Sequence, residues 1–279
     1  MGKRWQKVKR HRLGLVGLSF LVLLSLMILI TPLLPLHSPN EVNLLNRYEK
    51  PTLTHIFGTD QLGRDVLSRV LTGARVSLAV GLLSVAIQLV VAIPLGCLAV
   101  AVGGWLDASL QRIVEMFLSF PFLVIVLVLS SMLPGSMLNI TLIIGLVGWP
   151  RIFRLVRGEA LSVREEDYVE AAKSCGANLS RVVSVHVLPN ILGTILVAAT
   201  INCATAILIE AQISFLGFGI QPPTPTWGNM LMDATQTHIL SSKPWMWMTP
   251  GFLVVTTLLS LNFVGDALRD AFDPYYYES

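Results

Sequence analysis

The sequence has few charged residues and few cysteines. Only 13% of its 279 residues are Asp, Glu, Lys or Arg, against roughly 25% in an average soluble domain, whereas 53% are hydrophobic. This shortage of charge excludes an ordinary soluble domain and indicates a membrane protein. The three cysteines, Cys97, Cys175 and Cys203, form no pair at metal-ligand or redox spacing. We therefore expect no disulfide and no metal site.

Motifs of catalysis are also missing. The sequence has no phosphate-binding loop of the G-x-x-x-x-G-K-[ST] kind, so we do not expect the chain itself to be an ATP-driven motor. It has no H-E-x-x-H motif and no nucleophile with a recognisable base, which argues against an intramembrane enzyme. A secondary transporter or a channel stays an alternative, but no internal repeat and no set of intramembrane charges supports one. We predict a non-catalytic chain with no cofactor of its own.

Long uncharged runs predict an all-α membrane protein with six spans. About 20 apolar residues at 1.5 Å each cross a hydrocarbon core of about 30 Å. The longest run, 116–150, is divided into two spans by the break at Pro134-Gly135-Ser136. The other expected spans are 13–36, 76–102, 191–212 and 245–264.

Basic residues give the expected orientation. They crowd the first dozen positions, which is typical either of nucleic-acid binding or of the cytoplasmic end of a membrane protein, and the apolar run that follows favours the second reading. A secretory signal is disfavoured, because the run is too long and no cleavage pattern follows it. These basic residues are Lys3, Arg4, Lys7, Lys9, Arg10 and Arg12.

Six spans with a cytoplasmic start place both termini in the cytoplasm. The expected organisation is a basic tail with the first span in 1–36, an external amphipathic segment in 37–73, a core of five spans in 74–266 and a cytoplasmic tail in 267–279. The core contains a cytoplasmic loop at 158–190. Basic residues in 37–75 disagree with an external location, but acidic residues are interleaved among them.

The 158–190 loop is a polar segment between two apolar runs. Ser162 and Glu165 have the spacing of a capping box, which predicts a short helix that contains Glu170-Ala171-Ala172. Glycine at 176 is suited to end this helix. The resulting structure is a helix-turn-helix across the mouth of the bundle.

The second half of this loop leads into the fifth span. Asn178 is expected to cap a second short helix, and Pro189 suits the first turn of the span. From spacing alone, a plain connector is the commoner reading of such a loop, and a docking surface for another protein is the alternative.

Two further groups of polar residues are candidate sites. Glu210, with Gln212 beside it, lies near the end of the fifth span, where a carboxylate is expensive and usually functional. We expect Glu210 either to meet a structural partner, such as an arginine of another subunit, or to line a pathway. The external residues Asp60, Gly63, Arg64, Asp65 and Arg75 belong either to a solvated amphipathic helix or to a structural gate.

Four ordered blocks of residues resemble one family. Glu170-Ala171-Ala172, Gly176 and the Leu188-Pro189 pair resemble the EAA loop of binding-protein-dependent ABC importer permeases, with His186 in place of the usual aliphatic residue. Residues 57–75, 214–228 and 262–270 resemble the second permease subunit of peptide and nickel importers.

The resemblance implies a type-1 ABC importer permease, a multi-pass protein of the bacterial inner membrane that forms half of a translocation pathway. It implies coupling to an ATPase through the EAA loop, with ATP and Mg bound by two partner subunits. The other implied partners are a homologous permease subunit, an extracytoplasmic solute-binding protein and membrane lipid, and no nucleic acid. A peptide is the implied cargo, and nickel, a metal chelate or glutathione are the alternatives.

Overall fold

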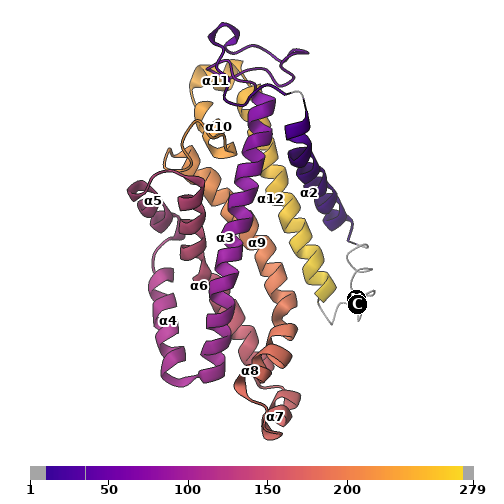
Figure 1. Cartoon of the computed structure of the whole chain (residues 1–279), viewed down its shortest axis with the longest axis vertical. Coiled ribbons are helices and arrows are strands. Elements are labelled where there is room, and N and C mark those ends of the chain that lie inside the picture. Colours follow the sequence, from indigo (N-terminus) through magenta and orange to yellow (C-terminus); the bar gives the residue numbers. More distant parts are fainter. Residues whose placement is uncertain (1–10, 35, 273–279) are drawn as a thin grey trace.

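The structure, a computed structural model, describes residues 11–34 and 36–272 and is mainly helical (Figure 1). Within these ranges no strand is formed, and Thr59 and Asp65 make an isolated β-bridge. The all-α prediction is therefore confirmed. Most of the basic residues near the start of the sequence, and the last residues of the expected C-terminal tail, lie outside the described residues.

Five helices are long and apolar enough to cross a membrane, and a bent pair makes a sixth span if it is counted as one. The pair is α4 and α5, which are bent by 80° at the break between them. The prediction of six spans is confirmed on that count. The helices are α2 (Arg12–Ile30), α3 (Val66–Val102), α4 (Gly104–Leu118), α5 (Phe122–Met132), α6 (Met137–Arg164), α9 (Leu188–Phe215) and α12 (Trp245–Phe272).

Short elements lie at the two ends of the bundle. We call the end that holds residues 39–65, α10 (Trp227–Asp233) and α11 (Thr237–Ser242) the upper end, as drawn in Figure 1. The opposite, lower end holds α7 (Asp167–Ser174) and α8 (Leu179–Arg181). The remaining elements are the 3-10 turns η1 (Thr31–Leu33) and η2 (Leu44–Asn46) and the π-helical segment η3 (Val182–Val187), which joins α8 to α9.

The first and last spans lie side by side. Helix α2 packs along α12, and the Nε2 atom of His11 lies 3.7 Å from an Asp270 carboxylate oxygen. The first span therefore begins at the end of the bundle where the last span finishes.

The third span differs from its expected form. It was predicted to start near Met116, but α4 begins at Gly104 and the span breaks at Ser119–Pro121. The prediction rested on uncharged runs and therefore left out the first half of α4, which contains charged residues. A charged residue that is paired does not interrupt a helix. Asp107 accepts hydrogen bonds of 2.6 and 2.7 Å from Arg157 of α6.

Other spans extend beyond their apolar runs. Helix α3 begins at Val66, so the external segment predicted for 37–73 ends at residue 65. Its start is fixed by Asp65, whose carboxylate accepts hydrogen bonds from the Ser68 amide and hydroxyl, both at 2.8 Å. Helix α12 continues to Phe272 rather than 264. The break predicted at Pro134-Gly135-Ser136 is confirmed, and Ser136 caps α6.

The core lies where α3, α6 and α9 meet. Val70, Ile144 and Ile207 are fully buried there, together with Trp227 of α10. A second cluster at the lower end includes Phe153 and brings α7 into contact with the spans. Large apolar side chains on the outer faces of the spans stay exposed, as expected of helices in contact with lipid.

Candidate functional site

Helix α7 forms an exposed tip at the lower end of the bundle. Glu170 and Ala171 are exposed and Ala172 is half-buried. Val169 of the same helix is fully buried in the lower cluster. The structure therefore fixes one face of α7 against the spans and leaves the other available to another surface.

Gly176 ends α7 as predicted. It has a φ of +85°, and the next amide, that of Ala177, donates to the Ala172 carbonyl at 3.0 Å. Asn178 then caps α8, because its side chain accepts a hydrogen bond from the Arg181 amide at 2.8 Å. Both predictions from the sequence are confirmed.

The predicted capping box was wrong. Ser162 lies in the last turn of α6 and Glu165 is the residue that follows that helix. Helix α6 continues this far partly because Arg164 donates a 2.6 Å hydrogen bond to the Val100 carbonyl of α3. The second short helix is not separate either, since α8 runs through η3 into α9.

Tyr168 joins α7 to the start of α9, a contact that the sequence analysis missed. Its hydroxyl accepts a 2.9 Å hydrogen bond from the Asn190 amide group, and its ring centroid lies 6.0 Å from that of His186. Leu188 is half-buried and Pro189 is exposed in the first turn of α9. Tyr168 directly precedes the buried Val169, so α7 is held to the bundle at two adjacent positions.

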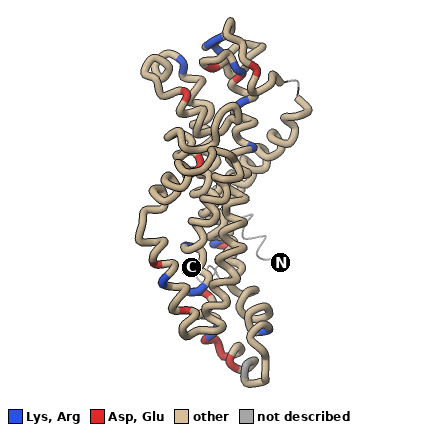
Figure 2. Tube along the Cα trace, turned by 60° about the vertical axis from the view of Figure 1, so that its left-hand side comes forward, with Lys and Arg blue, Asp and Glu red and all other residues tan. Residues whose placement is uncertain are grey.

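The tip of the lower end is acidic. Figure 2 shows acidic residues gathered there, and the exposed ones on α7 and just before it are Glu165, Glu166, Asp167 and Glu170. Their carboxylates lie near the first turn of α7, where negative charge is favoured by the helix dipole. The segment from residue 165 to 178 thus offers acidic and small side chains on one surface.

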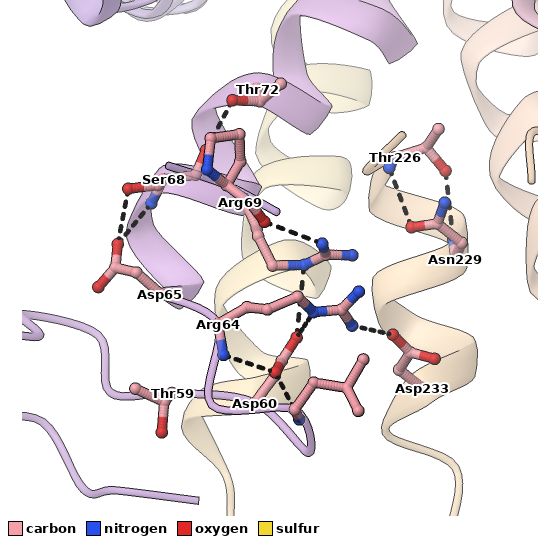
Figure 3. A network of polar contacts seen from close by, with 12 residues as sticks. Thr59, Asp60, Arg64, Asp65, Ser68, Arg69, Thr72, Thr226, Asn229 and Asp233 are labelled. Carbon is pink, nitrogen blue, oxygen red and sulfur yellow. Dashed lines mark hydrogen bonds and ion pairs between the residues drawn. The ribbon is translucent and has the colours of Figure 1, made fainter. Parts of the chain in front are cut away.

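A second group of polar residues is buried at the upper end (Figure 3). One Asp60 oxygen accepts a 2.6 Å hydrogen bond from Arg64 Nε and lies 3.5 Å from Arg69 Nε. Arg64 also donates to Asp233 of α10 at 3.2 Å, and Arg69 donates to the Pro39 carbonyl at 3.1 Å. We call Asp60, Arg64, Arg69 and Asp233 the upper network. It ties residues 39–65 to α3 and α10.

Of the other residues in the sequence prediction, Gly63 and Asp65 lie beside the upper network and Arg75 does not. Asp65 adds a 2.9 Å contact with His55. Gly63 has a φ of +73°, and a side chain there would collide with the Asn43 carbonyl. Arg75 is exposed on α3 and lies outside the network. The alternative of a solvated amphipathic helix was wrong, because Arg64 and Asp65 are buried.

Asp233 is the one member of the upper network that is partly exposed. Burial raises the pKa of its carboxyl, and the guanidinium groups of Arg64 and Arg69 oppose this shift. The two arginines therefore offset part of the effect of burial on the pKa of Asp233. The loss of either cation therefore weakens the link to α10.

Glu210 is fully buried between α9 and α3. Its two carboxylate oxygens accept hydrogen bonds of 2.8 Å from Ser77 and Ser214. Its partners are thus serines of its own chain rather than an arginine of another subunit, and it does not reach a surface that lines a pathway. Gln212 is half-buried on α9 and is not one of these donors. Among the described residues, no three His, Cys, Asp or Glu side chains could together hold a metal ion.

Comparison with known families matches most of the chain. Residues 88–276 match the family described as binding-protein-dependent transport system inner membrane component, and residues 2–51 match the N-terminal TM domain of oligopeptide transport permease C. A putative peptide permease protein of Brucella suis is 37% identical over 274 residues, which cover 98% of this chain and 91% of that protein. The dipeptide transport system permease protein of Alkalihalophilus pseudofirmus is 39% identical over 270 residues, which cover 97% and 88%.

A solved structure shares the fold. The chain is similar to one from the MetNI methionine ABC transporter in an inward-facing conformation, with a TM-score of 0.59 and 22% sequence identity. The match covers 74% of this chain and 97% of the other.

Replacement of Arg64 by glutamine should destabilise the upper end. The variant leaves the Asp233 carboxylate without its hydrogen-bonded cation and removes a buried partner of Asp60, a loss worth about 3 kcal/mol in the free energy of unfolding. Thermal unfolding in detergent measures it. Arg75→Gln is the matched control, because Arg75 is exposed on α3 and lies outside the upper network, and it should unfold like the wild type. Equal unfolding temperatures for both variants would show that the upper network contributes nothing.

Proposed function

The chain belongs to the family of binding-protein-dependent transport system inner membrane components, and we propose that it moves peptides as one of two different permease subunits in an ATP-driven importer. Members of this family are non-catalytic, multi-pass permease subunits of ABC importers in the bacterial inner membrane, with the type-1 importer fold. The family works with ATP-binding subunits and a substrate-binding protein. ATP and Mg therefore belong to the partners of this chain.

Coupling to the ATPase takes place at α7. The observation that supports this role is that an exposed tip is held firmly to a span: Val169 is buried in the bundle and Tyr168 is hydrogen-bonded to Asn190 of α9. A subunit that binds the Glu170-Ala171-Ala172 surface and moves it therefore moves the start of α9 as well. The chain between the tip and the span turns at Gly176 and enters α9 at Leu188 and Pro189.

In this arrangement the lower end lies in the cytoplasm and the upper end outside. The contact between His11 and Asp270 supports a common side for the start of the first span and the end of the last. The upper network supports a rigid outer surface, on which a solute-binding protein can release its cargo. The partner across the pathway is a homologous permease subunit.

The names of the similar proteins support a peptide cargo. The relatives from Brucella suis and Alkalihalophilus pseudofirmus are called peptide and dipeptide permeases, and a relative from Escherichia coli, 38% identical, is called a probable D,D-dipeptide permease. Nickel, metal chelates and glutathione are not favoured by these names. Uptake of labelled di- and oligopeptides by the reconstituted importer tests the cargo.

Valine at position 176 should uncouple the transporter. Gly176 has a φ of +85°, so a β-branched residue there is strained by about 1 to 2 kcal/mol, although nothing in the chain lies within 4 Å of the added Cβ. We expect Gly176→Val to insert in the membrane, to lose most peptide uptake and to retain less ATPase subunit on co-purification. Gly104→Val is the matched control, because Gly104 also has a positive φ and open space around it.

The control separates backbone strain from docking. Gly104 is the first residue of α4 and belongs neither to α7 nor to α8, and its variant should retain uptake and the ATPase subunits. If Gly176→Val behaves like the control, the segment is only a connector.

Native Cys175 offers a test of orientation. It is the exposed cysteine of the three, next to Gly176, whereas Cys97 and Cys203 are buried. An impermeant maleimide should therefore label Cys175 only when it is added to the cytoplasmic face of vesicles. In a Cys175→Ser background, Leu53→Cys at the upper end should react only from the other face, since Leu53 is fully exposed. Reaction of both from one face would contradict the proposed topology.

A further inference from the structure

A pocket opens at the break between α4 and α5. Its volume is about 360 Å³, and its walls are formed by residues 117–122, with Val147 and Arg151 from α6. None of the coupling residues of α7 and none of the upper network lies in it. The pocket combines aromatic rings with one cationic side chain.

Arg151 belongs to α6, one of the helices that are long and apolar enough to cross a membrane. It lies near the middle of α6, about 21 Å from the first residue of that helix at 1.5 Å per residue. Its side chain is exposed on the surface of the chain, and its guanidinium carbon lies 5.0 Å from the centre of the Phe122 ring. Among the described residues it has no hydrogen bond or ion pair. An arginine in this position needs water or an anion, because hydrocarbon offers it neither.

The broken span gives a second, independent indication of water at the same place. Between α4 and α5 the chain leaves helical geometry at Ser119–Pro121. Neither helix is long enough to cross a membrane by itself, but the two together are. Non-helical backbone at membrane depth is tolerated where it is buried in protein or lines a water-filled cavity. Ser119, Phe120 and Pro121 are exposed in this chain, so they are not buried within it. Both features favour an aqueous surface over a lipid-facing one for this pocket.

The charges around the pocket favour an anion. Glu115, the acidic residue nearest in sequence to the break, is paired with Arg112 at 3.1 Å, and both are largely exposed. Arg154, one turn from Arg151 on α6, is exposed and adds positive charge on the same helix. A guanidinium group binds a carboxylate through two parallel hydrogen bonds, and the Phe117 and Phe122 rings offer apolar contact to the atoms beside it.

We propose that Arg151 and the aromatic residues at the α4–α5 break form an anion-binding subsite on the translocation pathway, which holds a carboxylate of the cargo in transit. The identity of that cargo rests on the proposed peptide-import function, because every unmodified peptide ends in a carboxylate next to a side chain. The preference of the site for anions does not depend on that function. The same chemistry would fit the phosphate of a lipid headgroup, so the test includes a lipid comparison.

Charge-selective labelling tests the subsite in the assembled importer. In a Cys175→Ser background, Ser119→Cys places a thiol in the pocket, and anionic and cationic methanethiosulfonates of similar size are compared. We expect the anionic reagent to react faster, and Arg151→Gln to lower the ratio of anionic to cationic rates by about three- to tenfold. Phe120→Cys is a second reporter of the same pocket if Ser119→Cys does not assemble.

The matched control is Ser131→Cys. Ser131 is an exposed serine near the other end of α5, and its hydroxyl donates to a carbonyl of its own helix, as that of Ser119 does. Its rate ratio should not respond to Arg151→Gln. An unchanged ratio at position 119 would overturn the proposal, and so would absence of labelling there, which would mean that lipid or the partner subunit covers the pocket.

Labelling at position 119 in the presence of peptides or of different lipids identifies the ligand. A short peptide with a free carboxylate should slow the labelling at position 119, whereas the same peptide as a C-terminal amide should not. Charge preference without protection by peptide would support the subsite and count against peptide as cargo. If anionic phospholipid in the bilayer blocks labelling and zwitterionic lipid does not, the pocket holds a lipid headgroup and the proposal is wrong.

Discussion

Each polar group inside a bilayer must be paired within the protein or be in contact with water, and most features of this structure follow from that constraint. Glu210 is buried at the centre of the bundle with two serine hydroxyls as donors. Asp107 and Arg157 hold α4 against α6 through two short hydrogen bonds. Arg151 has no such partner in the described residues, and this difference supports the proposal that its pocket is an aqueous surface.

The two ends of the bundle meet the same constraint in different ways. At the upper end, the four charged residues of the upper network pair with one another and fix the irregular segment 39–65 to α3 and α10. At the lower end, the acidic residues of α7 face outward, and the helix is held by apolar burial and one tyrosine contact. In the proposed orientation, the upper network gives a rigid outer surface and α7 a protruding inner tip, which suits a permease that receives cargo on one side and force on the other.

The sequence was sufficient for the features that depend on local signals. The number of spans, the break before α6, the turn at Gly176 and the cap at Asn178 all follow from apolar length, proline, glycine and capping residues. Features that depend on pairing between distant residues were missed. The start of α4 was not predicted because Asp107 pairs with a residue 50 positions later in the sequence. Helix α6 extends through the expected capping box because Arg164 donates a hydrogen bond to α3. The hydrogen bond between Tyr168 and Asn190 could not be predicted from the sequence, since neither residue belongs to the block that resembles the EAA loop.

We propose that motion of α7 reaches the pathway through its contact with α9. The most direct measurement is the number of peptides imported per ATP hydrolysed by the reconstituted complex carrying Asn190→Leu, which removes the donor to Tyr168. We expect the ATPase subunits to stay bound and to hydrolyse ATP, while the import ratio falls about fivefold, the effect of one hydrogen bond of about 1 kcal/mol. An import ratio equal to that of the wild type would contradict it.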